Sequence, residues 1–239
     1  MSILNDWWGD LKSLFFPPRC PVCGEKMGEQ AITVCTRCRL EAPLTGYTHQ
    51  FDNPLSHTFW GEIPLHHASS LLFFSTSSGW RELIHDFKYR GRWRLAYEMG
   101  RWYGAELRDG GLLTNLDLVI PVPLHPLKRL LRGYNQSEYL AEGIARELGV
   151  EVDRTSLRRH RNNRSQTLRR RHERWENVAG VFSVRNPEKL VGKQILLVDD
   201  VITTGATLIS CGEALLKALP ECRLSVAALA ASDHHRKPY

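Results

Sequence analysis

The chain has 239 residues, enough for one large domain or two smaller ones with a hydrophobic core. Hydrophobic residues make up 42% and charged residues 24% of it, a composition that excludes a disordered or fibrous protein. The net charge of +6 permits phosphate, nucleic-acid or acidic partners without requiring one. No run of about 18 apolar residues occurs, so no membrane span is expected. The N-terminus shows no pattern of a secretory leader, and we therefore expect a cytoplasmic protein.

The N-terminal region divides into three segments. Apolar residues at helical spacing over 1–16 predict an amphipathic helix that Pro17 and Pro18 end. This helix packs on the main domain or, as an alternative, attaches to a membrane surface. A short cysteine-bearing segment follows over 19–45. Residues 46–65 are rich in turn formers and are expected to be a linker.

Two C-x₂-C pairs lie within the cysteine-bearing segment. They are formed by Cys20 with Cys23 and by Cys35 with Cys38. Two such tight turns assemble the tetrahedral Cys₄ shell that Zn²⁺ prefers, and no strand–helix setting for a redox C-x-x-C is evident. The spacing therefore predicts a structural Zn²⁺ site whose four positions the protein fills, with no catalytic role.

Strands and helices alternate from about residue 66 onwards. Strands are predicted over 66–74, 116–122, 194–198 and 223–230, and helices over 80–88, 93–108, 134–148 and 206–219. Several of the strands are continuous apolar runs, which are typical of parallel strands covered on both faces. The sequence therefore predicts an α/β fold with a parallel sheet flanked by helices.

The segment from Ile195 to Thr207 combines a buried strand, two aspartates and a loop that opens into a helix. Backbone N–H groups of such a loop converge on one anion, and Gly205 permits close approach. Asp199 and Asp200 beside this cradle suggest a sugar diol with Mg²⁺ nearby. An N-capping threonine beside solvent-facing aspartates is the structural alternative.

This pattern resembles the phosphoribosyl-pyrophosphate (PRPP) signature of type I phosphoribosyltransferases. The resemblance implies that Asp199 and Asp200 contact the ribose hydroxyls. It also implies that the 5-phosphate is held by the loop residues Val201, Ile202, Thr203, Thr204, Gly205, Ala206 and Thr207. Lys128, Arg129 and Arg132 follow the strand over 116–122 and are candidates for binding the pyrophosphate, because ligands gather where parallel strands end.

Further motifs resemble the ComF family of competence-associated phosphoribosyltransferase-like proteins. They are the paired cysteines and the segments 84–91, 120–125, 132–136, 165–167 and 174–178. Membership implies a phosphoribosyltransferase-like domain, expected over 60–235, and a zinc-ribbon module with its preceding helix over 1–45. It also implies a link to DNA uptake or processing, with competence or DNA-processing proteins as candidate partners.

The stretch from Arg154 to Arg174 is rich in arginine and includes Arg169, Arg170 and Arg171. It is interpreted as a loop that closes on PRPP, as a surface for single-stranded DNA, or as a solvated loop. The sequence leaves the acceptor, the oligomeric state and catalytic competence open. The alternatives to a ComF-type role are a metabolic phosphoribosyltransferase and a non-enzymatic PRPP sensor.

Overall fold

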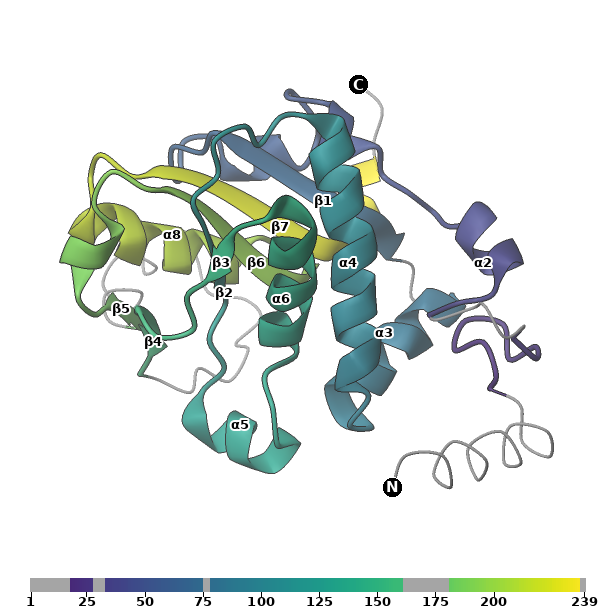
Figure 1. The fold of residues 1–239 in the computed structure, drawn as a ribbon. Coiled ribbons are helices and arrows are strands. Elements are labelled where there is room, and N and C mark those ends of the chain that lie inside the picture. Colours follow the sequence, from purple (N-terminus) through teal and green to yellow (C-terminus); the bar gives the residue numbers. More distant parts are fainter. Residues whose placement is uncertain (1–17, 28–32, 75–77, 161–180, 237–239) are drawn as a thin grey trace.

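A computed structural model describes residues 18–27, 33–74, 78–160 and 181–236. Its centre is a five-stranded sheet in the order β1-β7-β6-β2-β3, and every neighbouring pair is parallel. The strands are β1 (His67–Phe74), β2 (Leu118–Pro121), β3 (Glu151–Val152), β6 (Gln194–Ile202) and β7 (Arg223–Ser232) (Figure 1). The predicted α/β fold with a parallel sheet is confirmed.

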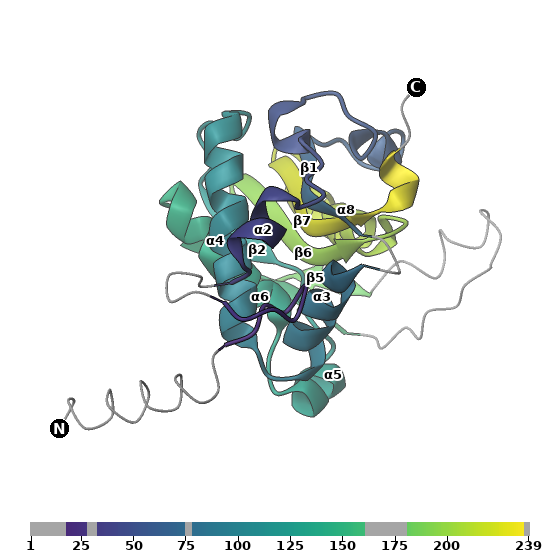
Figure 2. The same ribbon diagram turned by 90° about the vertical axis from the view of Figure 1, so that its right-hand side faces the viewer.

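Helices cover both faces of this sheet. One face carries α3 (Gly79–Tyr89), α4 (Trp93–Gly110) and α6 (Gln136–Leu148), and the other carries α8 (Ala206–Ala218) (Figure 2). Successive residues of β6 serve the two faces in turn, since Leu196 packs in the core beneath α4 and α6 while Leu197 packs in the core beneath α8. This double burial explains why the strand reads as an uninterrupted apolar run.

The remaining described elements are short. They are the helices α2 (Thr36–Leu40) and α5 (Pro126–Arg132), the antiparallel pair β4 (Leu157–Arg159) and β5 (Phe182–Val184), and the 3-10 helices η1 (Tyr47–His49), η2 (Ser56–Phe59), η4 (Pro187–Leu190) and η5 (Asp233–Arg236). The predicted N-terminal helix over 1–16 and the residues Arg169–Arg171 lie outside the described residues.

Residues 46–65 do not form the expected linker. Leu55, Phe59 and Ile63 are buried in the core on the α8 face. The side chain of Asn53 organises the turn, because its Oδ1 accepts from the N–H of Leu55 and its Nδ2 donates to the Ala68 carbonyl of β1. The polar residues here form turns within a packed segment. The polar composition of the segment alone did not indicate that its apolar side chains are buried.

The strand order changes direction at one point of the sheet, between β2 and β6. From β2 the chain proceeds outward to β3 and then returns to β6, on the other side of β2. The loops after β2 and β6 therefore diverge, and such a switch point is where open α/β sheets bind ligands. Asp199, Asp200 and the threonine loop follow β6 at this point, and α5 follows β2.

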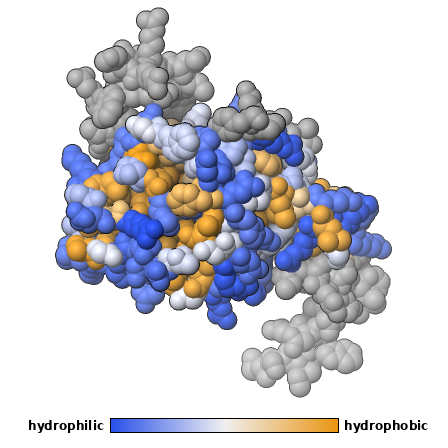
Figure 3. All heavy atoms as spheres, turned by 90° about the horizontal axis from the view of Figure 1, so that it is seen from above, coloured by the Kyte–Doolittle hydropathy of each residue, from blue (hydrophilic) through white to orange (hydrophobic). Residues whose placement is uncertain are grey.

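The described surface mixes apolar and hydrophilic side chains. On the face seen from above, apolar patches lie among hydrophilic side chains (Figure 3). Single exposed apolar residues are usual on globular proteins. Among the described residues no helix is both long and apolar enough to cross a bilayer.

Candidate functional site

A loop of small residues joins β6 to α8 and forms the centre of the candidate phosphate site. Thr203, Thr204 and Thr207 are exposed, whereas Gly205 is buried with a φ of +75°. A Cβ at Gly205 would lie 3.0 Å from Thr58 Cγ2, so both the backbone conformation and the space favour glycine. The unpaired N–H groups in the first turn of α8 and the exposed hydroxyls together form an anion cradle.

The side chain of His235, near the C-terminus, contacts the backbone of this loop. The ring of His235 is within hydrogen-bonding distance of the Thr203 carbonyl through Nε2 (2.7 Å) and of Thr58 Oγ1 through Nδ1 (3.2 Å). The Tyr47 hydroxyl donates to the His235 carbonyl. His235 is buried and therefore links the loop to the segment that precedes β1. No motif in the sequence pointed to this contact.

The two aspartates at the end of β6 have different partners. The Asp200 carboxylate is buried, pairs with Lys88 Nζ at 3.0 Å and accepts from Gln136 Nε2 at 2.6 Å. Asp199 Oδ1 accepts from Ser137 Oγ at 3.1 Å. Burial, reinforced by the Asp200 carboxylate, raises the pKa of Asp199 to about 7. The site therefore holds two adjacent carboxylates with one nearby ammonium group.

Sequence reasoning assigned no role to Lys88, Gln136 or Ser137. Lys88 lies within the segment 84–91, and Gln136 ends the segment 132–136, both of which were singled out only as family motifs. Their side chains converge on Asp199 and Asp200 because α3 and α6 cover the same face of the sheet. Lys88 and Gln136 could have been identified by considering what each polar residue of these motifs can bind.

The three predicted pyrophosphate-binding cations all lie on α5, but only one joins the aspartate cluster. Arg132 Nη1 donates to Gln136 Oε1 at 2.5 Å, and Gln136 in turn contacts Asp200. Arg129 makes a two-pronged ion pair with Glu138, at 3.0 and 3.2 Å. Lys128 is exposed. Pro126 lies in the first turn of α5, and Gly133, with a φ of +83°, ends the helix.

The four N-terminal cysteines converge on one point. The Sγ atoms of Cys20, Cys23, Cys35 and Cys38 all lie within 4.8 Å of one another. Those of Cys23 and Cys35 are 3.7 Å apart, close to the edge of about 3.8 Å in a tetrahedron with Zn–S bonds of about 2.3 Å. The donor set and its spacing fit a structural Zn²⁺ site.

Backbone N–H groups polarise two of these thiols, those of Cys20 and Cys35. The N–H of Cys35 donates to Cys20 Sγ at 3.4 Å, and that of Cys38 donates to Cys35 Sγ at 3.5 Å. Burial raises the pKa of Cys20, but hydrogen bonds from backbone N–H groups outweigh it and lower the pKa to about 7. A thiol that ionises easily is a ready ligand, because Zn²⁺ binds the thiolate form.

Two family models match parts of the chain. Residues 11–48 match the double zinc ribbon domain, and residues 135–239 match the phosphoribosyl transferase domain. The glutamine phosphoribosylpyrophosphate amidotransferase of Bacillus subtilis is a structural relative with 19% identity and a TM-score of 0.41, over 60% of this chain and 30% of that one.

Sequence relatives have names that refer to DNA and competence. The chain is 30% identical over 138 residues to the DNA utilization protein YhgH of Escherichia coli O157:H7, a match that spans 56% of this chain and 60% of the relative. It is 30% identical over 139 residues to competence protein F of Haemophilus influenzae, with 56% and 61% covered. The match therefore covers less than two thirds of these relatives. A match to a zinc ribbon ahead of a match to a phosphoribosyl transferase domain, together with relatives of these names, supports the resemblance to the ComF family.

Proposed function

We propose that the chain binds PRPP together with Mg²⁺ where β2 and β6 end. The observation that carries the proposal is the exposed threonine cradle at the start of α8, which directly follows two carboxylates at the switch point of the sheet. The cradle suits the 5-phosphate, since N–H groups and hydroxyls both donate to phosphate oxygens. Asp199 and Asp200 suit the ribose hydroxyls, which donate to carboxylates.

The ion pair of Lys88 and Asp200 makes the two carboxylates compatible with an anionic ligand beside them. Lys88 offsets the charge of Asp200 and Gln136 donates a hydrogen bond to it, so the repulsion between Asp200 and a bound phosphate is reduced. Mg²⁺, when bound with PRPP, would be held by oxygen atoms of Asp199 and Asp200 and would neutralise charge on the pyrophosphate. Arg132 then stands next to this cluster as a candidate partner of the pyrophosphate.

The same groups define what a transfer reaction would require. Breaking the bond between the ribose and pyrophosphate gives an oxocarbenium-like transition state, which needs charge stabilisation on the leaving group and firm holding of the sugar. Arg132, which contacts Gln136 beside the aspartates, is the proposed partner of the leaving group. Arg129 would have to exchange Glu138 for the pyrophosphate. A metabolic transferase and a PRPP sensor share this binding step and differ in whether pyrophosphate is released to an acceptor base.

Calorimetric titration tests the binding step. PRPP should bind the full chain with Mg²⁺ and more weakly without it. Asp199→Asn should weaken binding at least tenfold, roughly the value of one charged hydrogen bond. Asp109→Asn is the matched control, because it removes the same charge from an exposed position at the end of α4. No heat at millimolar PRPP with Mg²⁺ would contradict the proposal.

The cellular role proposed for the chain is DNA uptake or processing in the cytoplasm. The support comes from relatives named for DNA utilization and competence, together with the net charge of +6. Single-stranded DNA and DNA-processing proteins are the proposed partners, and the arginines Arg169–Arg171 are the proposed contacts to the strand. Complementation of a deletion strain in a DNA-uptake assay tests this role, and Asp199→Asn should fail where Asp109→Asn succeeds.

A further inference from the structure

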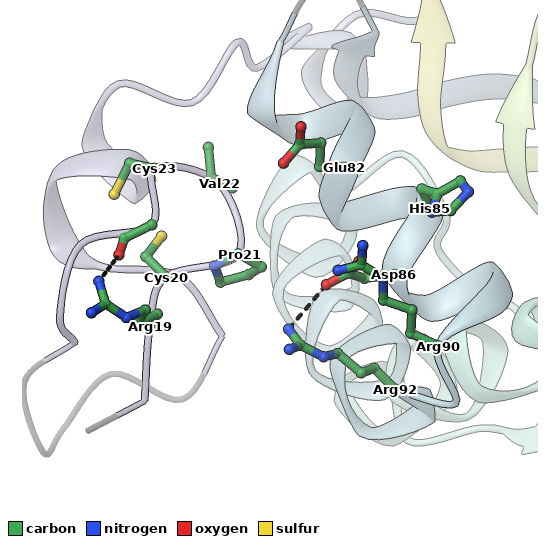
Figure 4. A pocket seen from close by; sticks show the side chains of 11 residues that line it. Arg19, Cys20, Pro21, Val22, Cys23, Glu82, His85, Asp86, Arg90 and Arg92 are labelled. Atoms are coloured by element: carbon green, nitrogen blue, oxygen red, sulfur yellow. Dashed lines mark hydrogen bonds and ion pairs between the residues drawn. The ribbon is translucent and has the colours of Figure 1, made fainter. Parts of the chain in front are cut away.

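A polar cavity lies between α3 and the cysteine-bearing segment, here called the cysteine module. It has a volume of about 560 Å³, and its walls are residues 19–24 on one side and Glu82, His85, Asp86, Arg90 and Arg92 on the other (Figure 4). The two walls meet in close contact, since a Cβ at Gly79 would lie 2.0 Å from the Val22 carbonyl oxygen. The volume is within the range of sites that bind small molecules.

One wall presents two arginines that a single carboxylate holds in place. The Asp86 side chain is only 9% exposed, and its two oxygens pair separately with Arg90 Nη1 at 3.1 Å and with Arg92 Nη1 at 3.0 Å. Each guanidinium has five N–H donors, so one ion pair leaves most of them available. Because Asp86 fixes both groups beforehand, a ligand would lose little side-chain entropy on meeting them.

The opposite wall contributes a third guanidinium. Arg19 Nη1 donates to the Gly24 carbonyl at 3.1 Å, which ties this side chain to the turn after the first cysteine pair (Figure 4). Three guanidinium groups thus stand against the two carboxylates of Glu82 and Asp86, and His85 adds a further donor. Guanidinium groups present on both walls favour a small, multiply charged anion with several acceptor oxygens.

We propose that this cavity binds a phosphate group and is distinct from the PRPP site. The group belongs either to the backbone of a nucleic-acid strand or to a free phosphorylated molecule, and the chemistry of recognition is the same for both. Arg19, Arg90 and Arg92 donate to its oxygens. The cysteine module thereby gains a role in binding, since Arg19 forms part of the site only while the zinc ribbon is folded against α3.

The decisive variant removes charge from both walls. Arg19→Gln with Arg90→Gln keeps the Arg92–Asp86 pair, so the buried carboxylate retains a partner. The control is Arg81→Gln with Arg94→Gln, which removes the same charge from exposed positions of α3 and α4 that do not line the cavity. The thermal unfolding midpoint of each variant establishes that the zinc-loaded full chain is folded.

Two probes distinguish the sources of the phosphate. If the ligand is a strand, a fluorescent oligothymidine should bind the cavity variant about tenfold more weakly than the control variant, with a shallower salt dependence; if it is a free anion, inorganic pyrophosphate should show the tenfold loss. The ¹⁵Nε–H signals of Arg19, Arg90 and Arg92 should shift with oligothymidine alone if the ligand is a strand, and with inorganic pyrophosphate if it is a free anion. Equal binding of both probes by the two variants, with unshifted signals, would overturn the proposal. PRPP calorimetry on the cavity variant should be unchanged, which keeps this test separate from that of the proposed function.

Discussion

Lys88 Nζ lies 3.0 Å from Asp200 Oδ1, and this ion pair joins the last turn of α3 to the end of the central strand β6. The carboxylate side chain is 8% exposed and the lysine side chain 22%. At such burial the Asp200 carboxylate depends on Lys88, because without it the charge would be held by Gln136 as its remaining side-chain partner and by little water. The pair therefore couples α3 to the candidate ligand site.

Replacing Lys88 should destabilise the protein. Lys88→Met leaves the buried Asp200 carboxylate with Gln136 as its remaining side-chain partner, and we expect a loss of about 2 kcal/mol, below the 3–5 kcal/mol of fully buried pairs because Lys88 is partly solvated. The unfolding midpoint should fall by about 4–8 °C in a thermal scan. Lys189→Met, at an exposed position in η4, should change it by less than about 2 °C. Equal effects of the two variants would mean that the ion pair contributes nothing to stability.

Stability should depend on pH through Asp199. Its pKa is raised to about 7, chiefly by burial. The folded protein then keeps a proton that the unfolded chain releases near pH 4, so this group lowers stability as the pH rises from about 4 to about 7. Urea titrations at several pH values should show Asp199→Asn gaining stability relative to the parent over this range and remaining level above it. A constant difference at every pH would contradict the raised pKa.

His235 should control the affinity of the phosphate loop without touching the ligand. His235→Ala removes both ring contacts, to the Thr203 carbonyl and to Thr58 Oγ1. We expect PRPP affinity to fall about tenfold, since the loop must then be ordered on binding. His235→Gln offers an amide donor and an amide acceptor and should restore much of the affinity. If alanine and glutamine behave alike in PRPP titrations while their unfolding midpoints match, His235 does not position the loop.

Removing zinc should disturb more than the ribbon. Val34 and Cys38 pack in the same core as Trp80 and Trp102, and the Arg39 guanidinium lies 4.9 Å from the centroid of the Trp102 ring. Cys20→Ser or Cys38→Ser should abolish a metal content of about one zinc per chain and change the tryptophan emission. Cys222→Ser, at a buried cysteine far from the cluster, should retain the metal. Metal-free protein with the emission of the parent would contradict the assignment.

Local sequence patterns predicted most of the helices and strands of the fold. The apolar run Ile195–Val198 predicted a strand because both of its faces are buried, and the helix predicted over 134–148 is found as α6, which ends at Leu148. Spacing alone identified the four cysteines that converge in space. These features depend on neighbouring residues, and so the sequence contains them in readable form.

Long-range contacts were not predictable in this way. Gln136 and Asp200 are separated by 64 positions, and their hydrogen bond exists only because α6 packs across the end of β6. Thr58 reaches His235 across 177 positions. The composition of residues 46–65 did not indicate that Leu55 and Phe59 are buried. A single sequence shows which residues are apolar, but it does not show which residues they contact.

Binding of single-stranded DNA should depend on the arginine stretch and not on the aspartates. The net charge of +6 and the run Arg169–Arg171 motivate weak, sequence-independent binding that releases counterions. Its affinity should fall steeply between about 50 and 200 mM salt in anisotropy titrations, and replacing the three arginines with alanine should lower both the affinity and the salt slope. Asp199→Ala should spare DNA binding and abolish PRPP binding, since it removes a ribose contact and no cation. If the triple variant binds single strands as well as the parent, the arginine stretch is not the DNA surface, and its role is that of an active-site loop or a solvated one.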